Sequence, residues 1–343
     1  MFVKKMQETP GQMLLVPILL ICVVMPKLLG ALENQSPISA TFNQSYFEHN
    51  STKRWVPLLQ ETQRKNHARG LLPEVGVCGP VKNGHRERNN VADIDEHPWT
   101  ALLEYSKPGN RTGFHCGGVL INKRYIVTAA SCVKAEEIPA KWNLTSVRLG
   151  EWNTQTETDC QNKKCSNTPI NVAIEKLIIH ENYNPKSVNR SNDIALLRLA
   201  RNVSFTDWIR PLCLQGHSRK AKHKEYFKVN GWGLLENGTR SDIKLNVHVQ
   251  GVNLPKCNAV YGVIGISLEK SQYCAVPKEG YHSCTGDAGN ALIGVDTTKS
   301  GQLYNFLFGI VSFGLNPCMT SSWPVVHTRV SSYKGWIQKQ IAP

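Results

Sequence analysis

After Cys78, hydrophobic residues occur in short runs that Gly, Pro and Asn residues separate. Short runs of this kind predict β-strands, and many of them divided by turn residues predict an all-β barrel or sandwich. The runs lie at 100–105, 118–120, 125–128, 194–199, 306–313 and 325–329. The last hydrophobic segment, 333–341, differs from them: Trp336, Ile337 and Ile341 recur at helical spacing and predict a terminal helix with one apolar face.

The N-terminal part of the chain has a different pattern. Lys4 and Lys5 precede an apolar run at 13–25, and the small residues Gly30 and Ala31 follow, so we predict a secretory signal peptide over 1–31. The alternative is a signal anchor that stays in the membrane, but the run is shorter than the ~20 residues of a membrane span. Residues 32–77 are mostly polar with no sustained periodicity, which predicts a flexible, glycosylated leader.

Cysteines and sequons support an oxidising secretory route. Eleven cysteines occur, of which Cys22 lies in the predicted signal, so ten remain and can all pair. Their spacing is too wide for a structural zinc site. Eight Asn-x-Ser/Thr sequons predict N-glycosylation at exposed positions. They are Asn34, Asn43, Asn50, Asn110, Asn143, Asn189, Asn202 and Asn237. We expect a secreted, extracellular protein without a membrane span after signal removal.

The formal net charge of +14 raises the question of an anionic partner. Arg219, Lys220, Lys222 and Lys224 cluster, but no stacking aromatics or nucleic-acid motif accompanies them, so we expect no nucleic-acid partner. A solvated basic loop is the simpler interpretation, and binding of a heparin-like polyanion is the alternative.

Six motifs occur in the order found in chymotrypsin-like serine proteases, and the resemblance covers 78–343. They are Pro98-Trp99, Cys116-Gly117-Gly118-Val119-Leu120-Ile121, Thr128-Ala129-Ala130-Ser131-Cys132, Asn192-Asp193-Ile194-Ala195-Leu196-Leu197, Gly231-Trp232-Gly233 and Val311-Ser312-Phe313-Gly314. The segment 148–152 and the loop between Cys160 and Cys165 resemble the arthropod clip-domain, easter-like branch, although no six-cysteine clip module precedes the domain here. The resemblance implies an all-β fold of two antiparallel six-stranded β-barrels with a C-terminal α-helix and the active cleft between the barrels.

The resemblance also implies how the cysteines pair, which sequence spacing alone leaves open among many connectivities. The implied disulfides are Cys116 with Cys132, Cys257 with Cys274, Cys284 with Cys318, Cys160 with Cys165, and Cys78 with Cys213. They use all ten cysteines of the mature chain.

Two of the three catalytic positions implied by the resemblance hold residues that cannot perform the chemistry. A serine protease needs a nucleophilic hydroxyl, an imidazole that takes its proton and a carboxylate that orients the imidazole. Asp193 is the carboxylate, but Ser131 stands at the histidine position and Ala288 at the nucleophile position. Ser131 beside Asp193 is the alternative nucleophile and base, but an ordinary carboxylate is a poor proton acceptor for a serine hydroxyl.

The implied specificity pocket and activation region are altered as well. His282 stands where trypsin-like members hold an acidic residue, and Val325 stands where the family keeps a glycine, so we expect the pocket beside Gly314 to be narrowed. Residues 78–90 are a remnant of the activation region, ahead of a protease-like domain at 91–343. A protease that cuts after Arg86 or Arg88 would expose Glu or Asn, which do not suit the apolar activation pocket.

The acidic loop around Glu151 is a candidate calcium site. Glu151, with Asn153, Glu157 and Asp159, lies in the loop that binds calcium in several relatives, and hard oxygen ligands suit this cation. An acidic surface loop is the alternative. No other cofactor is expected.

These residues lead to a functional hypothesis. We expect a secreted, catalytically inactive serine protease homologue that acts by binding as a cofactor, scaffold or decoy in an extracellular protease cascade, immune or developmental. Its partners would be active clip-domain proteases or their zymogen substrates. The alternatives are an active serine endopeptidase with atypical catalytic residues and a polyanion-binding carrier module.

Overall fold

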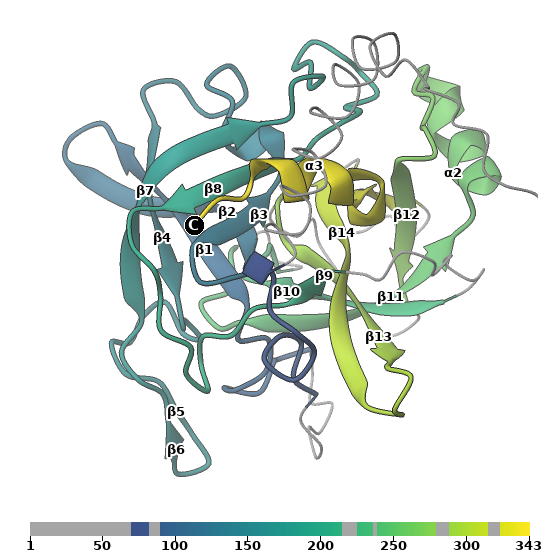
Figure 1. The fold of residues 1–343 in the computed structure, drawn as a ribbon. Coiled ribbons are helices and arrows are strands. Elements are labelled where there is room, and N and C mark those ends of the chain that lie inside the picture. Colours follow the sequence, from purple (N-terminus) through teal and green to yellow (C-terminus); the bar gives the residue numbers. More distant parts are fainter. Residues whose placement is uncertain (1–69, 82–89, 215–224, 236–238, 279–287, 315–322) are drawn as a thin grey trace, which may run out of the picture. The chain divides into compact units, whose positions relative to one another are not determined.

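The computed structural model describes residues 70–81, 90–214, 225–235, 239–278, 288–314 and 323–343. These residues all belong to one compact unit, Arg54–Pro343. Within it the chain forms two β-barrels and a few short helices (Figure 1).

The first barrel is a closed, antiparallel, six-stranded sheet in the order β1-β2-β3-β8-β7-β4. Its strands are β1 (Thr100–Lys107), β2 (Arg111–Leu120), β3 (Tyr125–Thr128), β4 (Asn143–Leu149), β7 (Ile170–Ile179) and β8 (Ala195–Leu199). Ala101 in β1 pairs with Gly118 in β2 and with Leu149 in β4. Because β3 and the first half of β1 are fully buried, they lack the polar alternation of a strand with one exposed face.

The second barrel is also antiparallel and closes when β13 pairs with β14. Its six strands are β10 (Tyr226–Gly231), β11 (Leu245–Val252), β12 (Gln272–Pro277), β15 (Val325–Arg329), β14 (Leu303–Phe313) and β13 (Ala291–Thr297). A further short strand, β9 (Cys213–Leu214), pairs with β14 in parallel. Phe227, Tyr273 and Phe308 pack against one another in the core of the second barrel. Their ring centroids are 4.6 to 5.6 Å apart, a separation typical of aromatic pairs.

Among the described residues, helices α2 and α3 lie outside the barrels. Asn253 caps α2 (Leu254–Tyr261), since its side chain accepts a hydrogen bond from the Lys256 amide. Helix α3 (Lys334–Gln340) buries Trp336 and Ile337 in the core of the first barrel. Figure 1 draws this helix in front of that barrel. The predicted terminal helix is therefore confirmed. The shorter elements are η1 (Ala130–Cys132), η2 (Gly262–Ile264), η3 (Val330–Tyr333), β5 (Cys160–Gln161) and β6 (Lys164–Cys165).

The fold class expected from the sequence is confirmed: the structure has two closed six-stranded antiparallel barrels, few helices and a C-terminal helix. The hydrophobic runs marked only half of the twelve barrel strands, because β4, β7, β10, β11, β12 and β13 were not among the predicted strands. Strand β7 shows why, since its burial pattern follows neither strict alternation nor a continuous apolar run.

Four of the five expected disulfides form in the structure. They join Cys78 to Cys213, Cys116 to Cys132, Cys160 to Cys165 and Cys257 to Cys274. The fifth pair, Cys284 with Cys318, lies outside the described residues.

The last residues of the predicted flexible leader pack against the barrels. Leu71 and Leu72 contact the first core, Val75 contacts the second, and the Leu71 carbonyl accepts a hydrogen bond from the Asn122 side chain. The structure thus departs from the prediction at this point: the segment before Cys78 belongs to the folded domain because its apolar side chains are packed there.

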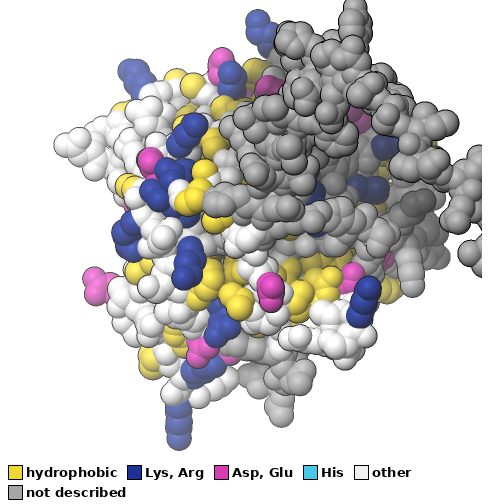
Figure 2. Space-filling view, viewed as in Figure 1, with side chains coloured by type: hydrophobic (Ala, Val, Ile, Leu, Met, Phe, Trp, Pro, Cys, Tyr) yellow, Lys and Arg dark blue, Asp and Glu magenta, His cyan; other side chains and the backbone are white. Residues whose placement is uncertain are grey.

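In the described part of the chain, no helix has the length and hydropathy needed to cross a membrane. Figure 2 shows Lys and Arg side chains spread among hydrophobic ones over the described part of one face. The basic cluster at 219–224 lies outside the described residues.

Candidate functional site

The structure brings two of the three predicted catalytic positions into direct contact where the barrels meet. Ser131 lies in η1, which follows β3, and Asp193 lies just before β8, the strand that pairs with β3. The second barrel reaches the same point through Ser312 in β14 and Thr328 in β15. Asp193 is fully buried among these four elements.

The carboxylate of Asp193 accepts three hydrogen bonds within the described chain. The backbone N–H of Ser131 donates to Oδ1 over 2.8 Å, and the Ser131 hydroxyl donates to Oδ2 over 3.2 Å. The Ser312 hydroxyl also donates to Oδ2, over 2.5 Å. Thr328 donates its hydroxyl to the Asp193 backbone carbonyl over 2.8 Å. These bonds tie both barrels to one buried residue.

Burial raises the pKa of the Asp193 carboxyl above its ordinary value, because the charged form loses its hydration. The hydrogen bonds from Ser312 and Ser131 act in the opposite direction, because they stabilise the carboxylate. The Ser131 hydroxyl thus serves as a donor to Asp193. A neutral imidazole at this position would offer a second nitrogen to accept a nucleophile's proton, and serine has no such group.

Ala288 lies directly before β13, and its position is fixed by the first barrel. Its carbonyl oxygen accepts a hydrogen bond from the Gly117 amide over 2.9 Å, and its methyl group packs against the first core. Gly289 follows with φ of 89°, and a Cβ there would come within 2.2 Å of the Gly117 carbonyl oxygen. Glycine is therefore required next to Ala288, but the side chain at 288 itself offers only a methyl group.

Asn290 is a residue at this site that sequence reasoning did not single out. Its side chain is almost fully buried, and neither its amide nitrogen nor its amide oxygen has a hydrogen-bond partner among the described residues. It lies between Gly117 and Gly231, because a Cβ at either position would collide with the Asn290 amide. The sequence signal that could have identified Asn290 is a large polar residue directly after Ala288-Gly289, in a chain that has glycine at positions 117 and 231.

Val325 lies beside Gly314, as the expected narrowing of the pocket requires. A Cβ placed on Gly314 would be 3.4 Å from Val325 Cγ2, an ordinary van der Waals distance. Val325 also packs against the core of the second barrel. His282 lies outside the described residues, as do Gly286 and Asp287 of the loop that precedes Ala288.

The end of the predicted activation remnant is paired with the second barrel. Asn90 accepts a hydrogen bond from the Asn246 amide at 2.7 Å, and the Ala92 amide donates to the Lys244 carbonyl at 2.9 Å. Val91 forms a β-bridge with Leu245 between them. Arg86 and Arg88 lie outside the described residues.

The predicted calcium ligands do not fit a cation. Glu151 is buried and binds the Arg148 guanidinium over 3.3 Å and the Trp152 amide over 2.9 Å. Asp159 accepts hydrogen bonds from the Trp152 and Asn153 amides and from the Thr156 hydroxyl. Burial and the nearby Asp159 charge raise the pKa of Glu151, and Arg148 opposes this. The oxygens are occupied by protein donors, and among the described residues no group of three or more His, Cys, Asp or Glu could hold a metal.

The sequons differ in their exposure. Asn110, Asn143 and Asn202 are exposed, whereas Asn189 is half-buried and accepts a hydrogen bond from the Ser267 amide. Asn34, Asn43, Asn50 and Asn237 lie outside the described residues.

Comparison with known proteins identifies the family. The model of the trypsin family matches residues 87–337, which is well over half of the chain. The chain belongs to the trypsin family. It is 44% identical to the CLIP domain-containing serine protease HP8 of Bombyx mori, over 79% of this chain and 73% of that protein. It is also 44% identical to the serine protease ea of Drosophila melanogaster, over 79% of this chain and 71% of that protein.

A solved structure agrees with this family. The Drosophila Grass clip serine protease of the Toll pathway superposes with a TM-score of 0.65 at 32% identity, over 79% of this chain and 76% of that chain. The contact between Ser131 and Asp193 joins the two positions that the sequence resemblance assigns to the catalytic histidine and aspartate.

Proposed function

We propose that this trypsin-family chain is a secreted, catalytically inactive protease homologue that acts by binding proteins of an extracellular protease cascade. The observation that carries the proposal is the chemistry at two positions. Ala288 presents a methyl group where a nucleophile is needed, and the Ser131 hydroxyl donates to Asp193 where an imidazole is needed. In a serine protease, loss of either group alone costs on the order of a millionfold in turnover, and the losses do not add.

The setting of this proposal comes from the relatives. They include clip-domain serine proteases, one of which works in the Toll pathway. A homologue that keeps both barrels but lacks the catalytic groups can still present the loops and strand edges through which such proteases meet their partners. We therefore propose cascade proteases or their zymogens as its partners, and the secretory route as its path.

Reaction with a fluorophosphonate probe tests the loss of catalysis. The purified mature protein, before and after treatment with trypsin, should show no covalent labelling and no peptide hydrolysis beyond a buffer blank. An active clip-domain protease at the same concentration provides the positive control. Labelling that disappears in a Ser131→Ala variant would show that Ser131 is a working nucleophile and would overturn the proposal.

A reconstituted cascade step tests the binding role. The protein is added to a purified clip-domain protease and its zymogen substrate, and the rate of zymogen cleavage is measured at increasing concentrations. A saturable rise or fall in that rate is expected. A rate that does not change, together with no detectable binding to either protein, would contradict a role in this step.

A further inference from the structure

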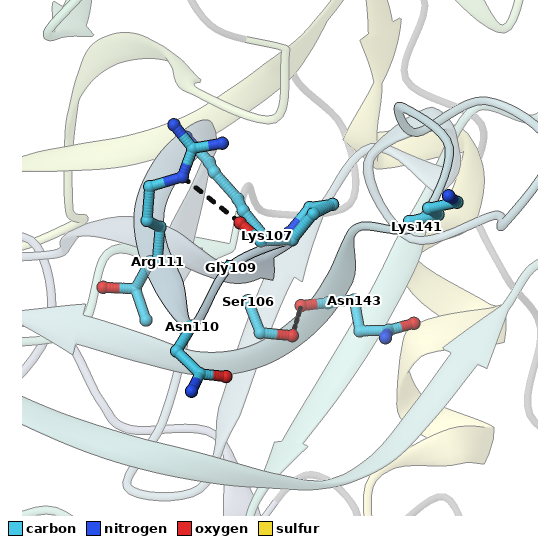
Figure 3. Close-up of a pocket in the computed structure, with 9 residues that line it drawn as sticks. Ser106, Lys107, Gly109, Asn110, Arg111, Lys141 and Asn143 are labelled. Atoms are coloured by element: carbon cyan, nitrogen blue, oxygen red, sulfur yellow. Dashed lines mark hydrogen bonds between the residues drawn. The ribbon is translucent and has the colours of Figure 1, made fainter.

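A basic concave surface lies at one end of the first barrel, outside the site described above. The turn between β1 and β2 and the segment that leads into β4 border an open surface depression with a volume of about 550 Å³. Figure 3 shows Lys107 and Arg111 at the two ends of the turn and Lys141 on the other segment. The volume is in the range of sites that bind small ligands or short peptide segments.

The positive charge of this surface is not neutralised by the described part of the chain. Lys107, Arg111 and Lys141 form no ion pair with a described carboxylate, and no Asp or Glu lines the surface. The Lys107 ammonium lies 4.1 Å from the centroid of the Trp142 ring, an attractive cation–π contact that fixes its position. Arg111 Nε donates to the Pro108 carbonyl over 3.2 Å, which orients the guanidinium.

The backbone that carries these side chains is held in defined turns. Gly109, Asn110 and Lys141 have φ values of 76°, 53° and 67°, in the left-handed region. Lysine rarely adopts this conformation, and such backbone persists where the surroundings impose it. Gly109 and Asn110 lie in the turn that the pairing of Lys107 in β1 with Arg111 in β2 closes, and Lys141 lies just before β4, which pairs with β1. The three cations are thus attached to the rigid barrel.

We propose that this surface binds an acidic peptide segment of a partner protein. Three cations line this surface, and Ser106, Thr112 and Asn143 add hydroxyl and amide groups to the lining. This arrangement matches a few closely spaced carboxylates with a peptide backbone that needs hydrogen bonds. A sulfated glycan chain would instead require an extended track of cations. The inference rests on the proposed function only in that the partner is a protein.

Fluorescence anisotropy with a labelled peptide tests the proposal. The probe is a twelve-residue peptide of alternating glutamate and glycine, and the same peptide with glutamine in place of glutamate is the reference. The protein carries N-glycans trimmed to single N-acetylglucosamine residues, because Asn110 and Asn143 are predicted acceptors in the lining. We expect the glutamate peptide to bind and the glutamine peptide to bind at least tenfold more weakly.

Two double variants locate the binding. In the first, Arg111→Gln and Lys141→Gln remove two cations of the surface and keep the Asn110 sequon. In the second, Lys176→Gln and Lys299→Gln remove two exposed cations elsewhere, from β7 and from the turn after β13. We expect the first variant to weaken peptide binding about fivefold or more. We expect the second variant to weaken it less than twofold, because exposed charge pairs are individually weak.

Equal weakening by the two variants would show that only net charge matters and would overturn the site. Binding of a heparin hexasaccharide that falls in the first variant, while the glutamate peptide does not bind, would overturn the peptide in favour of a polyanion. Neither readout depends on fluorophosphonate labelling, so this proposal and the proposed loss of catalysis can fail separately.

Discussion

Replacing Ser312 by alanine should destabilise the domain more than any other single serine replacement around Asp193. Both groups are buried, and the Ser312 hydroxyl donates to the carboxylate over 2.5 Å, a length typical of a hydrogen bond to a charged oxygen. Alanine removes this donor without adding volume. Loss of a hydrogen bond to a buried charge costs about 1.5–3 kcal/mol of the free energy of unfolding.

The same geometry predicts a smaller loss for Ser131→Ala. Its hydroxyl bond is longer, at 3.2 Å, and its backbone N–H continues to donate to Oδ1 at 2.8 Å after the replacement. We expect a loss of about 0.5–1.5 kcal/mol. Ser332→Ala is the matched control, because Ser332 is exposed and its side chain makes no hydrogen bond to the described residues; its effect should stay within about 0.5 kcal/mol.

The cost of Ser312→Ala should also depend on pH. The hydrogen bond stabilises the ionised carboxyl, so its loss raises further a pKa that burial has already raised. A folded-state pKa above the unfolded value means that the folded protein binds the extra proton, and stability falls as pH rises through this window. The variant should therefore lose more stability relative to the parent at pH 8 than at pH 5.

Urea unfolding followed by tryptophan fluorescence at both pH values measures these differences. The parent protein is measured at each pH, so titration of other groups cancels in the comparison. A loss below about 0.5 kcal/mol for Ser312→Ala, or a larger loss for Ser131→Ala, would refute the assignment of Asp193 as a buried anion held mainly by Ser312. Equal losses at pH 5 and pH 8 would refute the expected pH dependence, because they would show that the carboxyl has the same protonation state at both values.

Three further outcomes are expected. Ala288→Ser alone should give no fluorophosphonate labelling, because Ser131 cannot take the nucleophile's proton; labelling of this variant would contradict that reasoning. Burial lowers the pKa of His97 to about 3 and of His327 to about 4, so the unfolded state binds more protons than the folded state below about pH 6.5. The free energy of unfolding should therefore fall with decreasing pH by up to roughly 1.4 kcal/mol per pH unit for each histidine. Urea unfolding measures this slope, and His327→Gln should flatten it. Calcium or EDTA should leave the melting temperature unchanged within about 1 °C, because protein donors occupy Glu151; a clear rise with calcium would show a bound ion.

The sequence predicted the fold class through its motifs more than through its hydrophobic periodicity. Strand β3 is a short, continuous buried run, whereas β7 mixes exposed and buried positions, and its pairing with β8 is shifted between Ile174 and Lys176. Leu71 and Leu72 were placed in a flexible leader because isolated leucines in a polar segment give no local signal. Their partners lie in barrels formed much later in the chain.

The candidate site was predicted in its residues but not in its geometry. The motif order identifies Ser131, Asp193 and Ala288, but the role of Ser312 as a donor depends on β14 arriving at the same point, and sequence distance hides that contact. Asn290 was missed for a related reason. Its position between two glycines of different strands is a fact of tertiary packing. The predicted calcium ligands show the reverse case. Their residue types suit a calcium site, but their neighbours do not, above all Arg148, which forms an ion pair with Glu151.

Asp193 has a structural role that is separate from the catalytic role that the family resemblance implies for it. Removing its carboxylate would leave the Ser131 N–H and the Ser131 and Ser312 hydroxyls without their acceptor in the buried interface between the barrels, and unsatisfied buried donors are costly. Exchanging an imidazole for serine at 131 keeps a donor to that carboxylate. Exchanging a hydroxyl for a methyl group at 288 leaves no buried partner behind, because Ala288 is held through its backbone carbonyl. The buried contacts between the barrels therefore need the Asp193 carboxylate and are compatible with serine at 131 and alanine at 288.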